Sequence, residues 1–164
     1  MELQLVKSPQ EIETTHQLAQ EIWTQHYTPI IGIDQVNYML ANIQSLDAIK
    51  DHISTGQEYF LIKDQGLDVG YFSIYEKGKM LFLSKLYVKK GCRGKGLGKF
   101  AMNFMEKQAL ERKLKGIELT VNKYNDKTIE AYKKLGFVQT MELVQDIGNG
   151  FVMDDYVLVK ILES

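Results

Sequence analysis

A glycine-dense basic segment, residues 89–96, holds the backbone best suited to bind an anion in this chain. It follows the apolar run Met80–Val88, which has the length and content of a β-strand. From Leu97 onward the apolar residues recur at helical spacing. A strand, a tight turn and a helix leave backbone N–H groups unpaired at the helix start, where the helix dipole is positive. This order predicts an anion site, most often one for phosphate.

Two common phosphate motifs do not fit the segment. Gly91 and Gly96 have the spacing of a P-loop, but Leu97–Gly98 replaces the lysine and hydroxyl residue that this motif requires. Gly94 and Gly96 could begin a dinucleotide fingerprint, but Lys99 stands where its third glycine belongs. The sequence therefore excludes both nucleotide loops in their usual form.

A third pattern does fit, because Arg93–Gly98 reads Arg-Gly-Lys-Gly-Leu-Gly directly after a strand. Downstream stand Leu119–Asn122, then Asn125, then Ala131–Phe137. These segments resemble the GNAT superfamily of N-acetyltransferases, and the likeness extends over about residues 58–137. The closing Asp146–Tyr156 is weakly similar to a bacterial subgroup that includes polyamine acetyltransferases.

The resemblance implies acetyl-CoA as the cosubstrate. It assigns a backbone N–H near Val88 to the acetyl carbonyl, and it makes Asn125 a CoA contact. An ordinary helix N-cap is the structural alternative for Asn125, and the two roles do not exclude each other. Six cations and no acid between Lys85 and Lys99 suit the phosphates of CoA. The expected cofactor contacts are Leu86, Val88, Arg93, Gly94, Lys95, Gly96, Leu97, Gly98, Lys99, Asn125 and Tyr132.

Acetyl transfer to an amine needs a neutral amine and a proton for the departing thiolate. The resemblance puts Tyr132 at the general-acid position, and a packed core tyrosine is the structural alternative. A tyrosine titrates near 10 and a CoA-like thiol near about 8.5, so the hydroxyl can stabilise the leaving sulfur by hydrogen bonding. We expect Tyr132 to be that acid.

No general base can be assigned. Many relatives carry a glutamate on the strand before the loop, but Met80–Val88 contains no acid, and Ser84 and Lys85 stand there. A covalent route through Cys92 is disfavoured, because direct transfer in a ternary complex is the norm of the superfamily. The remaining candidates for the base are Glu76, His26, Tyr27, Asp154, Asp155 or a chain of waters.

Composition bounds the class of protein. The 164 residues have a net charge of −1, which gives no general attraction to nucleic acid or anionic lipid. We expect no signal peptide, no membrane span and no metal site, because the first residues lack the signal-peptide pattern, the apolar runs are short and metal-ligand spacing is missing. A single cysteine fits a reducing compartment. We therefore expect one domain over residues 1–164, cytoplasmic, without a metal, a membrane or a nucleic acid as partner.

The fold expected is α/β in the broad sense, a mixed and mostly antiparallel sheet of about six or seven strands with about four helices. A first helix from Pro9 should end near His26, because Thr28–Pro29 disfavours helical geometry. A second helical pattern covers residues 36–53. The other predicted strands are 3–5, 59–63, 69–75, 117–121, 137–147 and 151–161, and the other predicted helices begin near 97 and 126.

The function expected is transfer of an acetyl group from acetyl-CoA to a primary amine of a small molecule, such as a polyamine. The alternatives are a protein or peptide N-acetyltransferase and a non-catalytic acyl-CoA sensor. A homodimer through the last strands is common among relatives, and the sequence does not decide it.

Overall fold

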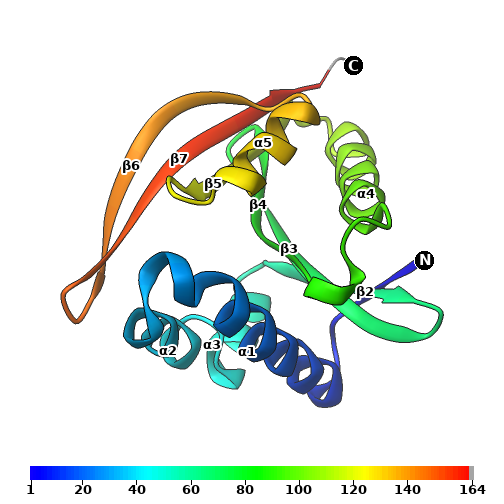
Figure 1. Cartoon of the computed structure of the whole chain (residues 1–164). Coiled ribbons are helices and arrows are strands. Elements are labelled where there is room, and N and C mark those ends of the chain that lie inside the picture. Colours follow the sequence, from blue (N-terminus) through cyan, green and yellow to red (C-terminus); the bar gives the residue numbers. More distant parts are fainter. Residues whose placement is uncertain (163–164) are drawn as a thin grey trace. The chain divides into compact units, whose positions relative to one another are not determined.

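A computed structural model describes residues 1–162 of the chain (Figure 1). The strands are β1 (Glu2–Leu5), β2 (Glu58–Asp64), β3 (Leu67–Lys77), β4 (Met80–Val88), β5 (Gly116–Asn122), β6 (Val138–Gly148) and β7 (Phe151–Ile161). The helices are α1 (Pro9–Ile31), α2 (Ile33–Asn42), α3 (Leu46–Ser54), α4 (Leu97–Glu111) and α5 (Asp126–Lys134), with a short 3-10 turn η1 (Lys90–Cys92).

The strands form one mixed sheet in the order β1-β2-β3-β4-β5-β7-β6. The β4–β5 pairing is parallel, as expected for two strands joined through a helix. The pairings β1–β2, β2–β3, β5–β7 and β6–β7 are antiparallel. The expected mixed, mostly antiparallel α/β fold is confirmed.

The chain divides into two compact units, and the boundaries between them fall within β3, β4 and α4. The first contains Met1–Tyr75 and Lys85–Phe104; the second contains Glu76–Ser84 and the chain from Met105 onward.

In the first unit, aromatic side chains alternate between the two faces of β2 and β3. Phe60 and Phe72 stack at 5.0 Å, and Phe104 of α4 packs edge-on against Phe60 at 5.0 Å. Tyr59 and Tyr71 occupy the opposite face, and their ring centroids are 6.4 Å apart. Strands covered on both faces are apolar along their length, which explains the continuous buried stretch of β3.

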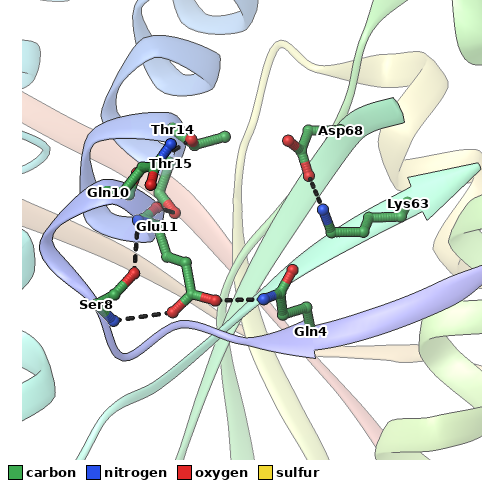
Figure 2. A network of polar contacts seen from close by, with 8 residues as sticks. All are labelled: Gln4, Ser8, Gln10, Glu11, Thr14, Thr15, Lys63 and Asp68. Atoms are coloured by element: carbon green, nitrogen blue, oxygen red, sulfur yellow. Dashed lines mark hydrogen bonds and ion pairs between the residues drawn. The ribbon is translucent and has the colours of Figure 1, made fainter. Parts of the chain in front are cut away.

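The start of α1 shows why the chain turns into a helix at Pro9. Figure 2 shows the capping box, in which Ser8 Oγ accepts from the Glu11 N–H at 3.1 Å. The Glu11 carboxylate accepts from the Ser8 and Lys7 N–H groups and from Gln4, and the backbone hydrogen bonds lower its pKa. A cap of this kind contributes about 1 kcal/mol.

Two helix predictions were wrong. Helix α1 runs through Thr28–Pro29 to Ile31, because Pro29 lies in the last turn and deprives only the exposed Gln25 carbonyl of a donor. The pattern over 36–53 is two helices, since Ser45 has extended backbone and its Oγ caps α3 by accepting from the Ala48 N–H at 3.1 Å.

In the second unit, β5 pairs with β4 on one side and with β7 on the other. Strands β6 and β7 form a long hairpin (Figure 1). Gly116 lies so close to β7 that an added Cβ would be 2.2 Å from the Lys160 carbonyl oxygen. No helix within residues 1–162 has the length and apolar content to cross a membrane.

Candidate functional site

The glycine-rich segment in the first unit has an open backbone. Gly94 and Gly96 adopt φ of 79° and 81°, a region that other residues rarely occupy. Leu97 is buried and anchors the first turn of α4. A Cβ added at Gly94, Gly96 or Gly98 would meet nothing within 4 Å. The segment therefore presents unobstructed main chain at a helix start, as an anion site requires.

The end of β4 is fixed by two hydrogen bonds within the first unit. The Lys89 N–H donates to the Val69 carbonyl of β3 at 2.8 Å, and Arg93 Nε donates to the Val88 carbonyl at 3.1 Å. Because successive N–H groups of a strand point in opposite directions, the Val88 and Leu86 N–H groups point away from β3. The parallel β4–β5 register ends at Leu83, before these residues.

The cations of residues 85–99 differ in their exposure to solvent. Lys90, Lys95 and Lys99 are exposed, and Lys89 lies 3.5 Å from the Glu21 carboxylate. Lys85, by contrast, is buried with 8% of its surface exposed, so it does not add to the charge on this surface as the count of six cations implied. The physical reason is the alternation of β4, which turns Leu81, Leu83 and Lys85 inward.

Lys85 lies beside a buried polar network. Its Nζ is 5.8 Å from the Tyr59 ring centroid, and burial lowers its pKa to about 8. The Tyr59 hydroxyl contacts Gln44 Nε2 at 3.0 Å and His52 Nδ1 at 2.7 Å, while the Tyr71 hydroxyl donates to Gln44 Oε1 at 2.8 Å. Burial raises the pKa of Tyr59 to about 12; burial and the Lys85 charge lower that of His52 to about 4.

Asn125 and Tyr132 lie in the second unit, on either end of the helix α5. Asn125 is buried at the N-cap position, but its side chain makes no capping hydrogen bond. Tyr132 is half-buried on α5, and its ring lies 5.4 Å from that of Phe137 at 66°. The first unit holds Leu86, Val88 and Arg93–Lys99, so the predicted contacts come from both units.

The candidate bases differ in their surroundings. Glu76 is exposed, and the His26 ring packs edge-on against Tyr27 at 4.8 Å. Asp154 forms an ion pair with Lys123 at 2.8 Å. Asp155 is 2% exposed, and its Oδ1 has no hydrogen-bond partner in the described part of the chain. Burial and then the Asp154 charge raise the pKa of Asp155 to about 6.

Sequence reasoning missed the burial of Lys85 and could not rank Asp155 above Asp154. A signal was present for both, because each stands in phase with inward-facing residues of its strand, Lys85 with Leu83 and Asp155 with Val157. The buried network around Gln44 left no such signal, since its members come from separate elements.

Residues 1–162 contain no metal centre, and their one cysteine, Cys92, forms no disulfide. No group of three or more His, Cys, Asp or Glu side chains is placed to hold a metal ion there. His16 Nδ1 contacts the Gln44 carbonyl at 2.6 Å, and Cys92 is a half-buried thiol in η1.

Comparisons with known proteins identify the family of this chain. The profile of the acetyltransferase (GNAT) family matches residues 15–137, which is more than half of the chain. A PaiA N-acetyltransferase from Thermoplasma acidophilum, solved in complex with coenzyme A, has a similar structure at 18% identity; the TM-score is 0.80, over 99% of this chain and 100% of that one.

Two further structures share the fold. A GCN5-related N-acetyltransferase from Rhodopseudomonas palustris is 20% identical, with a TM-score of 0.82 over 98% of this chain and 95% of that one. A spermidine N-acetyltransferase SpeG chimera from Vibrio cholerae and hSSAT is 18% identical, with a TM-score of 0.70 over 98% and 96%. The chain therefore belongs to the acetyltransferase (GNAT) family and is an acetyl-CoA-dependent N-acetyltransferase.

Proposed function

We propose that this enzyme transfers the acetyl group of acetyl-CoA to a primary amine of a small molecule, directly within a ternary complex. The observation that carries the proposal is the open main chain of Gly94–Gly98 at the start of α4. Cβ atoms are missing where a diphosphate would approach, and exposed lysines flank the segment. This donor set fits the pyrophosphate of CoA.

The contacts proposed for acetyl-CoA follow from this fit. The N–H groups of Arg93–Lys99 would hold the pyrophosphate, and Leu86 and Val88 would line the pantetheine arm. The Val88 N–H points away from β3, so it can donate to an acetyl carbonyl and stabilise the oxyanion that develops there. Asn125 is proposed as a further contact with the CoA arm, since its side chain does not cap α5.

The acid proposed for the leaving thiolate is Tyr132. Replacement by phenylalanine keeps the ring contact with Phe137 and removes only the hydroxyl. We expect Tyr132→Phe to lower kcat by about tenfold or more, with little change in the KM for acetyl-CoA, because proton delivery is lost and binding is not. Steady-state kinetics measure both constants. An unchanged kcat would remove Tyr132 from the mechanism.

The acceptor proposed is a small cationic amine, such as a polyamine. Support comes from the fold shared with the spermidine N-acetyltransferase chimera and from acidic residues on the last strands, namely Asp146, Asp154 and Asp155. A protein or peptide amine is the alternative acceptor. Exposed apolar side chains on β6, such as Met141 and Val144, support a homodimer through the last strands. The cytoplasmic location of the protein and its organisation as one domain stay predictions.

The decisive experiment has two stages. Isothermal titration first measures acetyl-CoA binding, and thiol release then follows turnover with spermidine, tyramine, free lysine and an alanine-terminal peptide. Turnover of a small amine supports the proposal, and turnover of the peptide alone would favour the alternative acceptor. Binding without turnover across the panel would favour an acyl-CoA sensor.

A further inference from the structure

Asp155 occupies an unusual position for a carboxylate. It lies on β7 directly opposite Asn122 of β5, and its side chain is 2% exposed. The other neighbour across the hairpin is Leu143 of β6. Neither facing residue is charged, and Asp155 Oδ1 has no hydrogen-bond partner within residues 1–162. A buried carboxylate oxygen without a donor is costly unless a ligand supplies one.

The adjacent residue shows how this hairpin treats a carboxylate that serves structure. Successive strand residues face opposite sides, so Asp154 points away from the Asp155 side. Lys123 Nζ lies 2.8 Å from Asp154 and 3.2 Å from Glu142, and it is 5.7 Å from the Tyr156 ring centroid. These are the charged groups near Asp155 on the paired strands. The cation among them, Lys123, already pairs with Asp154 and Glu142.

Within the second unit, Asp155 is linked through Asn122 to the start of α5. Asn122, its partner across the ladder, ends β5, and its carbonyl accepts from the Asn125 N–H at 3.0 Å. Asn125 in turn begins α5, the helix that carries Tyr132. Directly opposite residues of an antiparallel pair share a face, so Asp155 and Asn122 side chains lie together. One unit thus holds the proposed acid and, beside the turn leading to it, a buried carboxylate with one oxygen that lacks a hydrogen-bond partner.

We propose that Asp155 binds the ammonium group of the acceptor and removes its proton, which makes it the general base of the acetyl transfer. This inference rests on the function proposed above. An alkylammonium brings the charge and the N–H donors that the buried oxygen lacks. The ligand class is therefore a primary amine that is cationic at neutral pH.

The proton and bond changes balance as follows. The ammonium gives one proton to the Asp155 carboxylate, and the neutral nitrogen forms a bond to the acetyl carbon. The C–S bond then breaks as Tyr132 gives its proton to the sulfur, and the nitrogen returns a proton to Tyr132. Asp155 finally releases its proton to solvent. Its raised pKa makes it a stronger base than a surface carboxylate, while it stays ionised at neutral pH.

The test compares Asp155→Asn with Glu142→Gln, the same change of carboxylate to amide at an exposed position of the neighbouring strand. We measure kcat/KM with a panel amine that the wild type acetylates, from pH 7 to pH 10, and acetyl-CoA affinity by titration. We expect Asp155→Asn to lose about 100-fold or more at pH 7. Glu142→Gln should stay within about threefold, because exposed pairs contribute little.

The pH dependence separates a base from a merely structural group. An alkylamine loses its own proton near about 10.4, so the deficit of Asp155→Asn should shrink toward that pH, and Asp155→Glu should restore part of the rate at pH 7. A deficit equal at every pH, or no deficit, would overturn the inference while the wild type still turns over. A wild type that acetylates no amine would overturn the proposed function itself, and the inference with it.

Discussion

The two units bury polar groups in opposite ways. In the first, the Tyr59 and Tyr71 hydroxyls share the amide of Gln44, and His52 provides Tyr59 with a second partner. In the second, Asp155 is buried beside neutral neighbours with one oxygen unmatched. A matched network stabilises a unique packing, whereas an unmatched charge destabilises the resting protein. The contrast separates a group kept for structure from one suited to meet a ligand.

The same contrast gives the two regions opposite responses to pH. The pKa of His52 falls from 6.5 to about 4 on folding, so the unfolded chain binds more protons and stability decreases as the pH falls through this window. The pKa of Asp155 rises from 3.8 to about 6, so the folded chain binds more protons and stability decreases as the pH rises from about 4 to about 6.

The largest effect is expected from Gln44→Leu in the matched region. Gln44 is fully buried, and its loss leaves two tyrosine hydroxyls without their shared partner. Tyr59 keeps His52 as a partner, so the Tyr71 hydroxyl is the group left unsatisfied, and the unfolding free energy should fall by about 3 kcal/mol. Denaturant unfolding measures the change, with the exposed Gln145→Leu as control. A loss under about 1 kcal/mol would show that the network is not structural.

Asp155→Asn should act in the opposite direction on stability. Removing the buried charge should raise the unfolding free energy at pH 7, by at most about 3 kcal/mol for a pKa raised from 3.8 to about 6. The gain should appear between about pH 4 and pH 6 and then level off. Urea titrations across this range measure it. A variant less stable than the wild type at pH 7 would mean that Asp155 is paired like Gln44.

The smallest effect is expected from Asp154→Asn. Its ion pair with Lys123 is partly exposed, so the unfolding free energy should change by less than about 1 kcal/mol. The variant should also lower the pKa of Asp155, because the Asp154 charge contributes to its rise. Carboxyl chemical shifts followed against pH report that pKa. A pKa that stays the same would assign the whole shift to burial.

The sequence predicts the elements around the glycine-rich loop well and the surroundings of Lys85 and Asp155 poorly, for physical reasons. Strand periodicity, glycine density and helical spacing are local, so Met80–Val88, the loop and the start at Leu97 could be predicted. The burial of Lys85 depends on which face of β4 is covered, and the isolation of Asp155 depends on its register with Asn122. Such partners are set by tertiary pairing, which local patterns do not contain.

Helix boundaries failed where one local rule met another. The rule against a helical residue before proline predicted an end near His26, but a proline in the last turn removes only one exposed hydrogen bond. The periodic apolar residues of 36–53 hid the break that Ser45 introduces by capping the following helix.

Two glycines of this chain should differ in how well they tolerate substitution. At Gly70 a Cβ would be 2.4 Å from the Tyr87 carbonyl oxygen, so almost any replacement forces two strands apart. At Gly98 a side chain would enter open space, and the backbone there does not require glycine. In a library scored for both protein abundance and acetylation, substitutions at Gly70 should lose both signals, whereas Gly98→Ala should keep abundance and report only on what the open loop binds.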